Sequence, residues 1–487
     1  MLHIRFLILF FLTLAFQAAC VHRLASAEPG PGAPFEETAP LESDATSQPR
    51  QGDAARGYDR LVTQAFLPGD FDRETFDRLW ESWPEPLRSQ AAQATLSQRR
   101  WMAFDRYGLT PRDPELAKER SVTDPGDPLQ YVVDSSGKWT MNCFSCHGGS
   151  VYGMPTPGSP NNRFALQTLT EEIRWTKFRN GVGFGRMEMG SLLIPLGTTH
   201  GTTNAVVFGM GLMHYRDEQL NLVDRPPISF THHDMDAPPW WTFYKRPYLY
   251  IDGFAEKGHR GLMQFTLVPE NDARFYREHE DDFRDVYAYL SSLRPPKYPG
   301  PIDDKLARAG RSLFEANCSE CHGTYGRNDE YPNRMVAIDE IGTDPVRHEA
   351  LSVAGRKLYA KSWFAHAGEE DEQATIVAPE GYVAPPLDGI WASAPYFHNG
   401  SVPTLHAVLH PDDRPAIWQR TNDDCDDEKV GLTVRVLDQP LLEHPDVAVR
   451  RSVFDTRRFG KSNSGHDYPE RLDEDEKRAV LEYLKTL

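Results

Sequence analysis

NCFSCHGG, residues 142–149, is the stretch that decides the fold, and its core returns as NCSECHG at residues 317–323. Each copy contains Cys-x-x-Cys-His. In this pattern two thiols three positions apart bond one porphyrin, and the adjacent histidine binds its iron. A zinc site would need further ligands at close spacing, and none flanks either copy. The motifs therefore predict two covalently bound haem c groups, held by Cys143, Cys146 and His147 and by Cys318, Cys321 and His322.

Similar helical patterns surround the two motifs. Apolar residues recur at i, i+4 and i+7 in two segments, at Val286, Leu290 and Leu293 and again at Val480, Leu484 and Leu487. The proline-rich stretch 293–304 separates the two halves, and residues 303–317 form a helical pattern that leads into Cys318. We therefore predict a mainly α fold with two cytochrome c-type haem domains, 57–298 and 299–487, the first enlarged by long loops.

The N-terminus has the pattern of an export signal. A mostly apolar run, Phe6 to Phe16, follows two basic residues and is too short to span a bilayer. We predict a signal peptide over residues 1–27, with a lipoprotein-type cut that leaves Cys20 as the rival reading. Residues 28–56 are rich in Pro, Gly, Ser and acid and are predicted to form a disordered tether. The protein is therefore expected in the periplasm or outside the cell, and not as a transmembrane protein.

The charge balance narrows the possible partners. The chain has 71 acidic residues against 53 Lys and Arg, a formal net charge of −18, which argues against nucleic acid. Four of its six cysteines belong to the haem motifs, so no disulfide framework remains. Cys425 lies among acidic residues that disfavour its thiolate, and it is predicted to be unreactive.

The residues alone leave several candidates for the second axial ligand of each iron. The second half has a single methionine, Met335, only thirteen residues after His322, which favours a histidine as the second ligand there. The candidates are His348, His366, His398, His406, His410, His444 and His466. In the first half, several methionines and histidines compete and no spacing selects one, which is compatible with an open iron. They are Met154, Met187, Met189, Met210, Met213, Met235 and Met263, with His200, His214, His232, His233 and His259.

Four further stretches carry a family resemblance. Together with the haem motifs, APYFHNGSVPTL (394–405) resembles the bacterial di-haem cytochrome c peroxidase superfamily, which includes the methylamine-utilisation di-haem enzymes. Within that superfamily, GTTNAVVFGMG (201–211), RGLMQF (260–265) and GKSNSGHDY (460–468) are most similar to the di-haem rubber oxygenases and related fatty-acid dioxygenases.

This resemblance implies different roles for the two haems. The haem on His147 would be the reaction centre, with dioxygen or peroxide on its open face, and Phe265 would be a pocket residue above it. His322 and His466 would both bind the second iron, with His398 a structural neighbour. In a peroxidase, Glu188 would be a candidate acid.

The leading hypothesis is an exported di-haem c-type oxidoreductase of the dioxygenase or peroxidase kind, with the bis-His haem as an electron-transfer or tuning site. A small apolar substrate with dioxygen, or peroxide, would be its reactants, and a small redox protein would supply electrons. Trp391 is an aromatic residue that could lie between the haems. The alternatives are a cytochrome c peroxidase that reduces hydrogen peroxide and a non-catalytic electron-transfer cytochrome with two six-coordinate irons.

Overall fold

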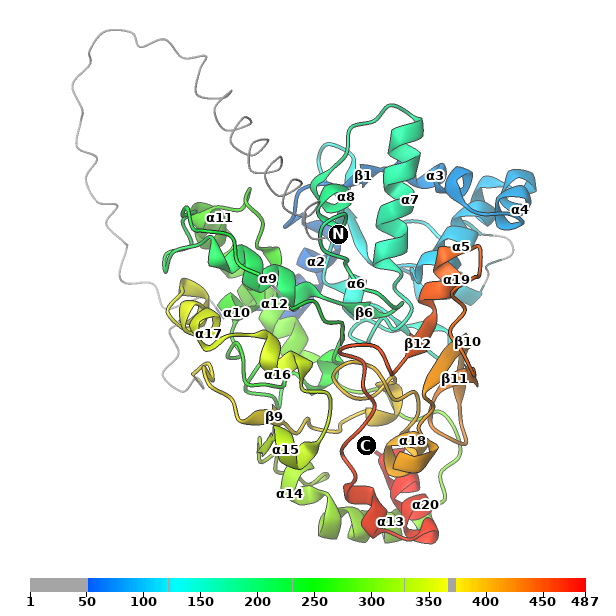
Figure 1. Ribbon diagram of the computed structural model, residues 1–487, viewed down its shortest axis with the longest axis vertical. Helices are drawn as coiled ribbons and strands as arrows, with labels where there is room; N and C mark the ends of the chain where they lie inside the picture. The colour runs from blue at the N-terminus through cyan, green and yellow to red at the C-terminus, as the bar shows by residue number, and fades with distance from the viewer. Residues whose placement is uncertain (1–50, 119, 121–122, 230, 328, 367–373) are drawn as a thin grey trace, which may run out of the picture. The chain divides into compact units, whose positions relative to one another are not determined.

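The structure is a computed structural model that describes residues 51–118, 120, 123–229, 231–327, 329–366 and 374–487 (Figure 1). The predicted signal peptide, 1–27, and the predicted tether up to residue 50 lie outside the described residues. The first described helix, α2 (Ala54–Thr63), begins three residues before the boundary predicted at Gly57.

Two pairs of helices organise the two halves of the chain. Helix α2 packs against α12 (Glu280–Ser292), and α13 (Asp304–Asn317) packs against α20 (Glu474–Leu484). Figure 1 shows α13 and α20 side by side at the bottom of the view. The repeated apolar spacing explains the pairing, because it places Val286 and Leu290 of α12, like Val480 and Leu484 of α20, on one buried face.

Each pair crosses at a glycine. A Cβ atom added to Gly57 would lie 2.1 Å from the backbone oxygen of Asp285, and one added to Gly310 would lie 1.9 Å from that of Ala479. Only glycine allows the two helix backbones to approach so closely. The halves therefore repeat the same helix crossing, although the first motif follows its glycine after 86 residues and the second after 8.

Further helical segments connect these pairs. In the first half they are α3 (Arg73–Asp77), η1 (Leu79–Ser82), α4 (Leu87–Gln93), α5 (Leu96–Tyr107), η2 (Pro114–Lys118), α6 (Phe144–His147), α7 (Leu166–Arg179), α8 (Arg186–Gly190), α9 (Ala205–His214), η3 (Trp240–Thr242), α10 (His259–Met263), η4 (Gln264–Thr266) and α11 (Ala273–Glu278). In the second half they are α14 (Ser319–His322), α15 (Ile338–Ile341), α16 (Val346–Ala350), α17 (Val353–Ala360), η5 (Trp363–Ala365), η6 (Ile390–Ala392), α18 (Leu405–Leu409), η7 (Pro411–Asp413), α19 (Val447–Arg451) and η8 (Tyr468–Arg471).

The strands are short and antiparallel. One three-stranded sheet has the order β1-β3-β2 and another the order β11-β10-β12, and the remaining strands form the pairs β4-β5, β6-β7 and β8-β9. Their bounds are β1 (Phe71–Asp72), β2 (Tyr131–Val133), β3 (Lys138–Met141), β4 (Ser150–Val151), β5 (Met154–Pro155), β6 (Thr202–Thr203), β7 (Met235–Asp236), β8 (Met335–Ala337), β9 (Gly381–Val383), β10 (Ile417–Asp426), β11 (Gly431–Val436) and β12 (Val453–Asp455).

The predicted mainly α class is correct only in part, because the structure is mixed, 41% helical and 12% strand. The largest departure is the pair β10-β11, in which Trp418 lies opposite Val436 and Cys425 opposite Leu432. The acidic run at the end of β10 has low strand propensity, so the sequence pattern did not predict this hairpin. Pairing with β11 at both ends of β10, on either side of an irregularity between Arg420 and Cys425, overrides that propensity.

The enlargement of the first half also differs from the prediction of long loops. Residues between 71 and 196 build a separate hydrophobic core, in which Trp83 Nε1 donates a hydrogen bond of 2.8 Å to the hydroxyl of Tyr107. Helix α5 contributes Phe104 and Tyr107, three positions apart on its buried face. The added segment is thus a packed layer of helices with a small sheet.

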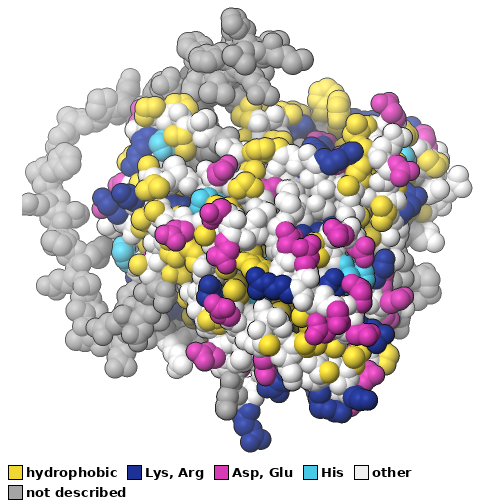
Figure 2. All heavy atoms as spheres, turned by 60° about the horizontal axis from the view of Figure 1, so that its bottom comes forward, with side chains coloured by type: hydrophobic (Ala, Val, Ile, Leu, Met, Phe, Trp, Pro, Cys, Tyr) yellow, Lys and Arg dark blue, Asp and Glu magenta, His cyan; other side chains and the backbone are white. Residues whose placement is uncertain are grey.

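The second half also contributes to the core of the first. Leu351, Tyr359 and Phe364 pack in one cluster with Phe254 and Met263. The described chain from residue 51 onward accordingly forms one compact unit. Figure 2 brings the bottom of Figure 1 forward and shows acidic and basic side chains interspersed on that face. No helix among the described residues is long and apolar enough to cross a membrane.

Candidate functional site

The two motif histidines share one hydrogen-bond arrangement. His147 ends α6 and its Nδ1 lies 3.0 Å from the carbonyl oxygen of Pro238, while His322 ends α14 with its Nδ1 2.8 Å from that of Pro385. A carbonyl only accepts, so each Nδ1 carries the proton and each Nε2 keeps its lone pair. Burial lowers the pKa of His147 to about 4 and also lowers that of His322. Both imidazoles are therefore neutral at pH 7, and each keeps on Nε2 the lone pair that a metal ligand needs.

The motif cysteines suit covalent attachment. Cys143, Cys146, Cys318 and Cys321 are free thiols in the structure. Burial raises the pKa of Cys143 and of Cys318 to about 11. Thioether bonds to a porphyrin require reduced cysteines, so these residues fit the haem c that the motifs predict.

A second histidine ring lies across from His322. The ring centres of His322 and His466 are 6.1 Å apart. Two imidazoles on opposite sides of one metal ion, each with a metal–nitrogen bond of about 2 Å, have centres about 6 Å apart. Burial, His322 and Arg414 lower the pKa of His466 to about 3, so its ring is neutral. The pair has the spacing and the protonation state that one shared iron requires.

The loop that carries His466 is tightly held. The backbone N–H of His466 donates to the carbonyl of Ile341 at 2.7 Å. Arg414 Nη1 donates to the carbonyls of Asn463 at 2.8 Å and Gly465 at 2.6 Å. Gly465 has φ +77°, and an added Cβ would lie 2.2 Å from the backbone of Gly342. The loop geometry therefore needs glycine immediately before the histidine.

We expect Gly465→Ala to lower the free energy of unfolding by about 1–2 kcal/mol, because an alanine is strained in the left-handed backbone conformation of this position. The collision with Gly342 should also displace His466, which raises the high-spin fraction in the absorption spectrum. Gly137→Ala is the matched control, since Gly137 has φ +81° with no atom within 4 Å of an added Cβ. Identical spectra for the two variants would contradict the prediction.

Three of the four stretches that carry the resemblance meet in one buried network. Asn399 of the 394–405 stretch donates to the carbonyl of Ser462 at 2.9 Å. Next to it, Lys461 Nζ lies 2.9 Å from Asp234 Oδ2 and donates to Thr199 Oγ1 at 2.6 Å. Asp234 also accepts from Thr202, in the 201–211 stretch, at 3.0 Å. The pairing of Lys461 with Asp234 has no signal in the sequence, because no local pattern pairs residues so far apart.

The other candidate histidines of the second half have different surroundings. His348 Nε2 lies 3.0 Å from the carbonyl of Pro379, and His398 packs on Tyr382 with ring centres 4.7 Å apart. The rings of His406 and His410 stack at 3.9 Å. Of the seven histidines that the sequence left open, only His466 has a ring contact with His322 in the described chain.

The ring of His147 has a different neighbour. It stacks on Trp240 with centres 4.7 Å apart and planes 25° apart, and within the described residues it contacts no histidine ring. Met213, Met235 and Met263 are buried in the first half's core. Of the competing histidines, His214 Nε2 lies 2.9 Å from the Pro226 carbonyl and His259 Nε2 lies 2.9 Å from Glu280. His233 uses Nδ1 for the Thr231 carbonyl at 3.0 Å and keeps a buried Nε2 without a partner in the described chain.

Phe265 is not a core residue. It lies in η4, its side chain is 44% exposed, and its ring centre is 6.1 Å from that of Tyr250. Glu188, in contrast, is fully buried and pairs with Lys177 between α7 and α8. Glu188, the candidate acid of a peroxidase, is therefore held in a buried ion pair.

Aromatic side chains lie between segments close to the two motifs. Trp391 is buried, with its ring 5.2 Å from that of Tyr298 and 6.2 Å from that of Tyr152. Tyr152 is five residues after His147, and Trp391 is six residues after Pro385. The three rings thus connect the neighbourhoods of the two motifs.

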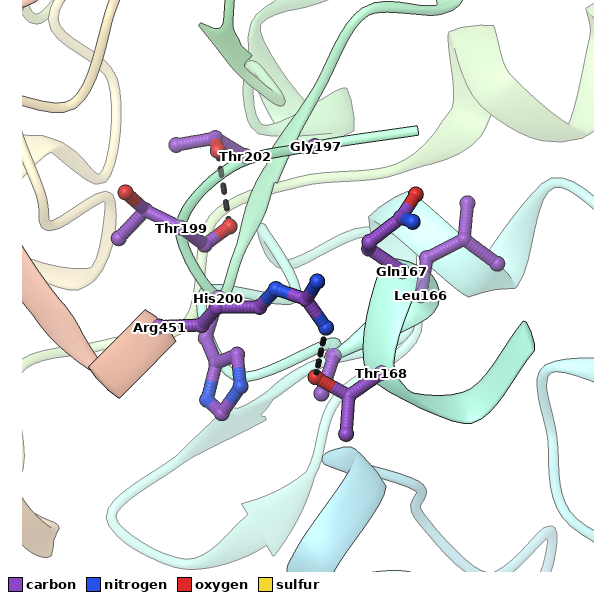
Figure 3. A pocket seen from close by; sticks show the side chains of 9 residues that line it. Leu166, Gln167, Thr168, Gly197, Thr199, His200, Thr202 and Arg451 are labelled. Carbon is purple, nitrogen blue, oxygen red and sulfur yellow. Dashed lines mark hydrogen bonds between the residues drawn. The ribbon is translucent and has the colours of Figure 1, made fainter. Parts of the chain in front are cut away.

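A crevice beside the GTTH stretch (197–200) is too tightly packed to hold a water molecule. Figure 3 shows Arg451 reaching across it to Thr168 of α7, a hydrogen bond of 3.2 Å. The backbone N–H of His200 donates to the carbonyl of Arg451 at 2.9 Å. This crevice joins α7 to α19 and does not resemble a substrate pocket.

A segment in the second half of the chain matches a known protein family. Residues 381–419 match the family described as RoxA-like, cytochrome c-like. This segment is similar to that family over 39 of the 487 residues. It contains Pro385, whose carbonyl accepts from His322, and the APYFHNG stretch. A cytochrome c-like domain implies haem c as cofactor and a haem oxidoreductase or electron-transfer protein.

Two curated relatives from Sinorhizobium fredii match part of the chain. The uncharacterized protein y4iM is 32% identical over 236 residues, which cover 41% of this chain and 53% of the relative. The uncharacterized protein y4iJ is 32% identical over 263 residues, which cover 41% of this chain and 42% of the relative. The matched region is about half the length of these relatives or less, and neither name states an activity.

Proposed function

We propose that the protein is an exported di-haem c-type oxidoreductase that activates dioxygen or peroxide at its N-terminal haem. Cys143, Cys146 and His147 would hold that haem, and Cys318, Cys321, His322 and His466 the second. The haems supply the redox chemistry when bound. The chain's own residues supply ligation, orientation and the surroundings of each iron.

The asymmetry between the two motif histidines carries this proposal. Both donate from Nδ1 to a prolyl carbonyl, but among the residues that the structure describes only His322 has a second histidine ring, 6.1 Å away. His147 has Trp240 stacked on it instead. A bis-His iron is six-coordinate and suited to electron transfer, whereas an iron with one protein ligand has a face for a reactant.

Several large apolar side chains are exposed, which favours an apolar substrate. Phe265 is partly exposed, and further exposed apolar residues cluster in the sequence at the end of α7 and around α8, namely Trp175, Phe178, Val182, Phe184, Met189, Leu192 and Leu193. Large contiguous apolar patches on a protein surface often mark binding sites. In this proposal Phe265 excludes water from the reactive face and contacts the substrate.

A cytochrome c peroxidase is the second candidate, and the aromatic group around Trp391 favours it. Electrons from a small redox protein would enter at the second haem and pass by Tyr298, Trp391 and Tyr152 towards the first. Oxygen uptake with an apolar alkene, compared with oxidation of a reduced cytochrome by hydrogen peroxide, separates the two reactions.

Absorption and EPR spectra with and without carbon monoxide test the proposal. We expect one low-spin haem and one that binds carbon monoxide in the intact protein, and loss of turnover in His147→Ala. His214→Ala, in the same half with its ring on the Pro226 carbonyl, should behave as the intact protein. A protein with two six-coordinate haems, inert to oxygen and peroxide, would instead be an electron-transfer cytochrome.

A further inference from the structure

A fully buried ion cluster joins the two halves of the chain. Asp252, from the segment between η3 and α10, pairs with Arg347 Nη2 at 2.9 Å and with Arg356 Nη2 at 2.5 Å. Arg347 lies on α16 and Arg356 on α17, and all three side chains are 0% exposed. This Asp252–Arg347–Arg356 cluster is separate from the residues that the haem motifs provide.

The charges in this cluster do not balance. Two guanidinium groups face one carboxylate, and Arg347 Nε, Arg347 Nη1 and Arg356 Nη1 are buried without a hydrogen-bond partner in the described chain. Asp344 is another buried acid close by in sequence, but its oxygens accept from the backbone N–H groups of Val346 and Ser462, at 2.9 Å each. A buried unpaired cation is costly, so the cluster lacks an anion.

The neighbouring side chains do not provide that anion. His398 and His233 are near enough to Arg347 for its charge to lower their pKa values, after the larger effect of burial. Both rings are therefore neutral at pH 7. The guanidinium carbon of Arg347 lies 5.2 Å from the ring centre of Tyr250, which presents an aromatic face and no negative charge.

The cluster also lies at the junction of the two candidate haem sites. His398, beside Arg347, packs on Tyr382, and Tyr382 precedes Pro385, the carbonyl partner of His322, by three residues. The carbonyl of His398 accepts from the backbone N–H of Asp236 at 2.9 Å, two residues before Pro238, the partner of His147. Contacts through His398 therefore link the surroundings of Arg347 to the residues beside both prolyl carbonyls.

We propose that Arg347, positioned by Asp252 together with Arg356, binds a propionate carboxylate of one of the two haems. A guanidinium N–H donates a short, charge-assisted hydrogen bond to a carboxylate, and Arg347 Nε and Nη1, on different edges of the guanidinium, have no partner in the described chain. Asp252 holds Arg347 Nη2 at 2.9 Å, so the guanidinium group is fixed in place before the haem binds. This inference rests on the proposed two-haem protein and names the residues that anchor its cofactor.

Optical redox titration of the haem-loaded protein tests the inference. In Arg347→Gln, the propionate loses its cation, and the midpoint potential of one haem should fall because unneutralised negative charge stabilises the ferric state. Arg347→Lys keeps the charge and should restore most of the shift. Arg216→Gln is the matched control, since Arg216 is equally buried but donates to the carbonyls of Leu220 at 2.8 Å and Val268 at 2.7 Å.

The outcomes are distinguishable. A shift confined to the low-spin haem assigns the propionate to the haem on His322, and a shift confined to the haem that binds carbon monoxide assigns it to the haem on His147. Unchanged potentials in Arg347→Gln overturn the inference, as do intact-protein potentials that follow chloride concentration at constant ionic strength, which indicate a free anion. If no haem binds carbon monoxide, the proposed function fails, yet the Arg347 shift is still measured on the six-coordinate haems.

Discussion

His466→Ala is expected to convert one of the two haems from a low-spin to a high-spin form, which removes the whole low-spin EPR signal of that haem. The ring centres of His322 and His466 are 6.1 Å apart, the separation that two ligands of one iron require. Alanine has no side-chain ligand, and the covalent bonds of Cys318 and Cys321 should keep the haem attached. The change is therefore one of coordination and not of haem content.

His398→Ala is the control for this experiment. His398 is a buried histidine of the same half with a pKa lowered to about 3, but its ring packs on Tyr382 and not on His322. We expect this variant to keep both the low-spin signal and the carbon monoxide difference spectrum. If His466→Ala leaves the low-spin signal intact, or if His398→Ala removes it, the assignment of His466 is wrong.

Local features made part of the molecule predictable from sequence. Both haem motifs and both terminal helices depend on residues a few positions apart, such as Val480 and Leu484, so their spacing is visible in the chain. The glycines at the two helix crossings belong to the same repeat, but the sequence does not show which helix Gly57 or Gly310 contacts. The partner lies more than 160 residues away in each case.

Contacts between distant segments explain what sequence could not supply. The seven candidate histidines of the second half are equivalent by spacing, and only the folded chain brings His466 next to His322, 144 residues away. The family resemblance selected His466 but not Arg414, whose guanidinium holds the loop before it. Asp252 and its two arginines had no sequence signal, because an isolated charged residue is most often on the surface.

Asp252→Ala is expected to reduce the free energy of unfolding by about 3–5 kcal/mol, because it leaves two buried guanidinium groups without their shared carboxylate. Guanidinium chloride unfolding followed by far-UV circular dichroism measures the change. Asp475→Ala is the surface control, since Asp475 and its partner Arg478 are 88% and 69% exposed, and it should not shift the midpoint. Equal midpoints for the two variants would show that the cluster does not stabilise the fold.

Two further measurements separate charge from packing at Asp252. The double variant Asp252→Leu, Arg356→Met removes one carboxylate and one guanidinium, leaves Arg347 for the proposed propionate, and should recover much of the lost stability if uncompensated charge is the cause. Arg347 and Arg356 hold the pKa of Asp252 below its ordinary value, although burial opposes them. A carboxyl whose pKa is lower in the folded state contributes its full stability above its unfolded pKa of about 4, and loses it as pH falls through the folded value. The intact protein should therefore lose stability in acid more steeply than Asp252→Ala, because the variant lacks the group that takes up this proton.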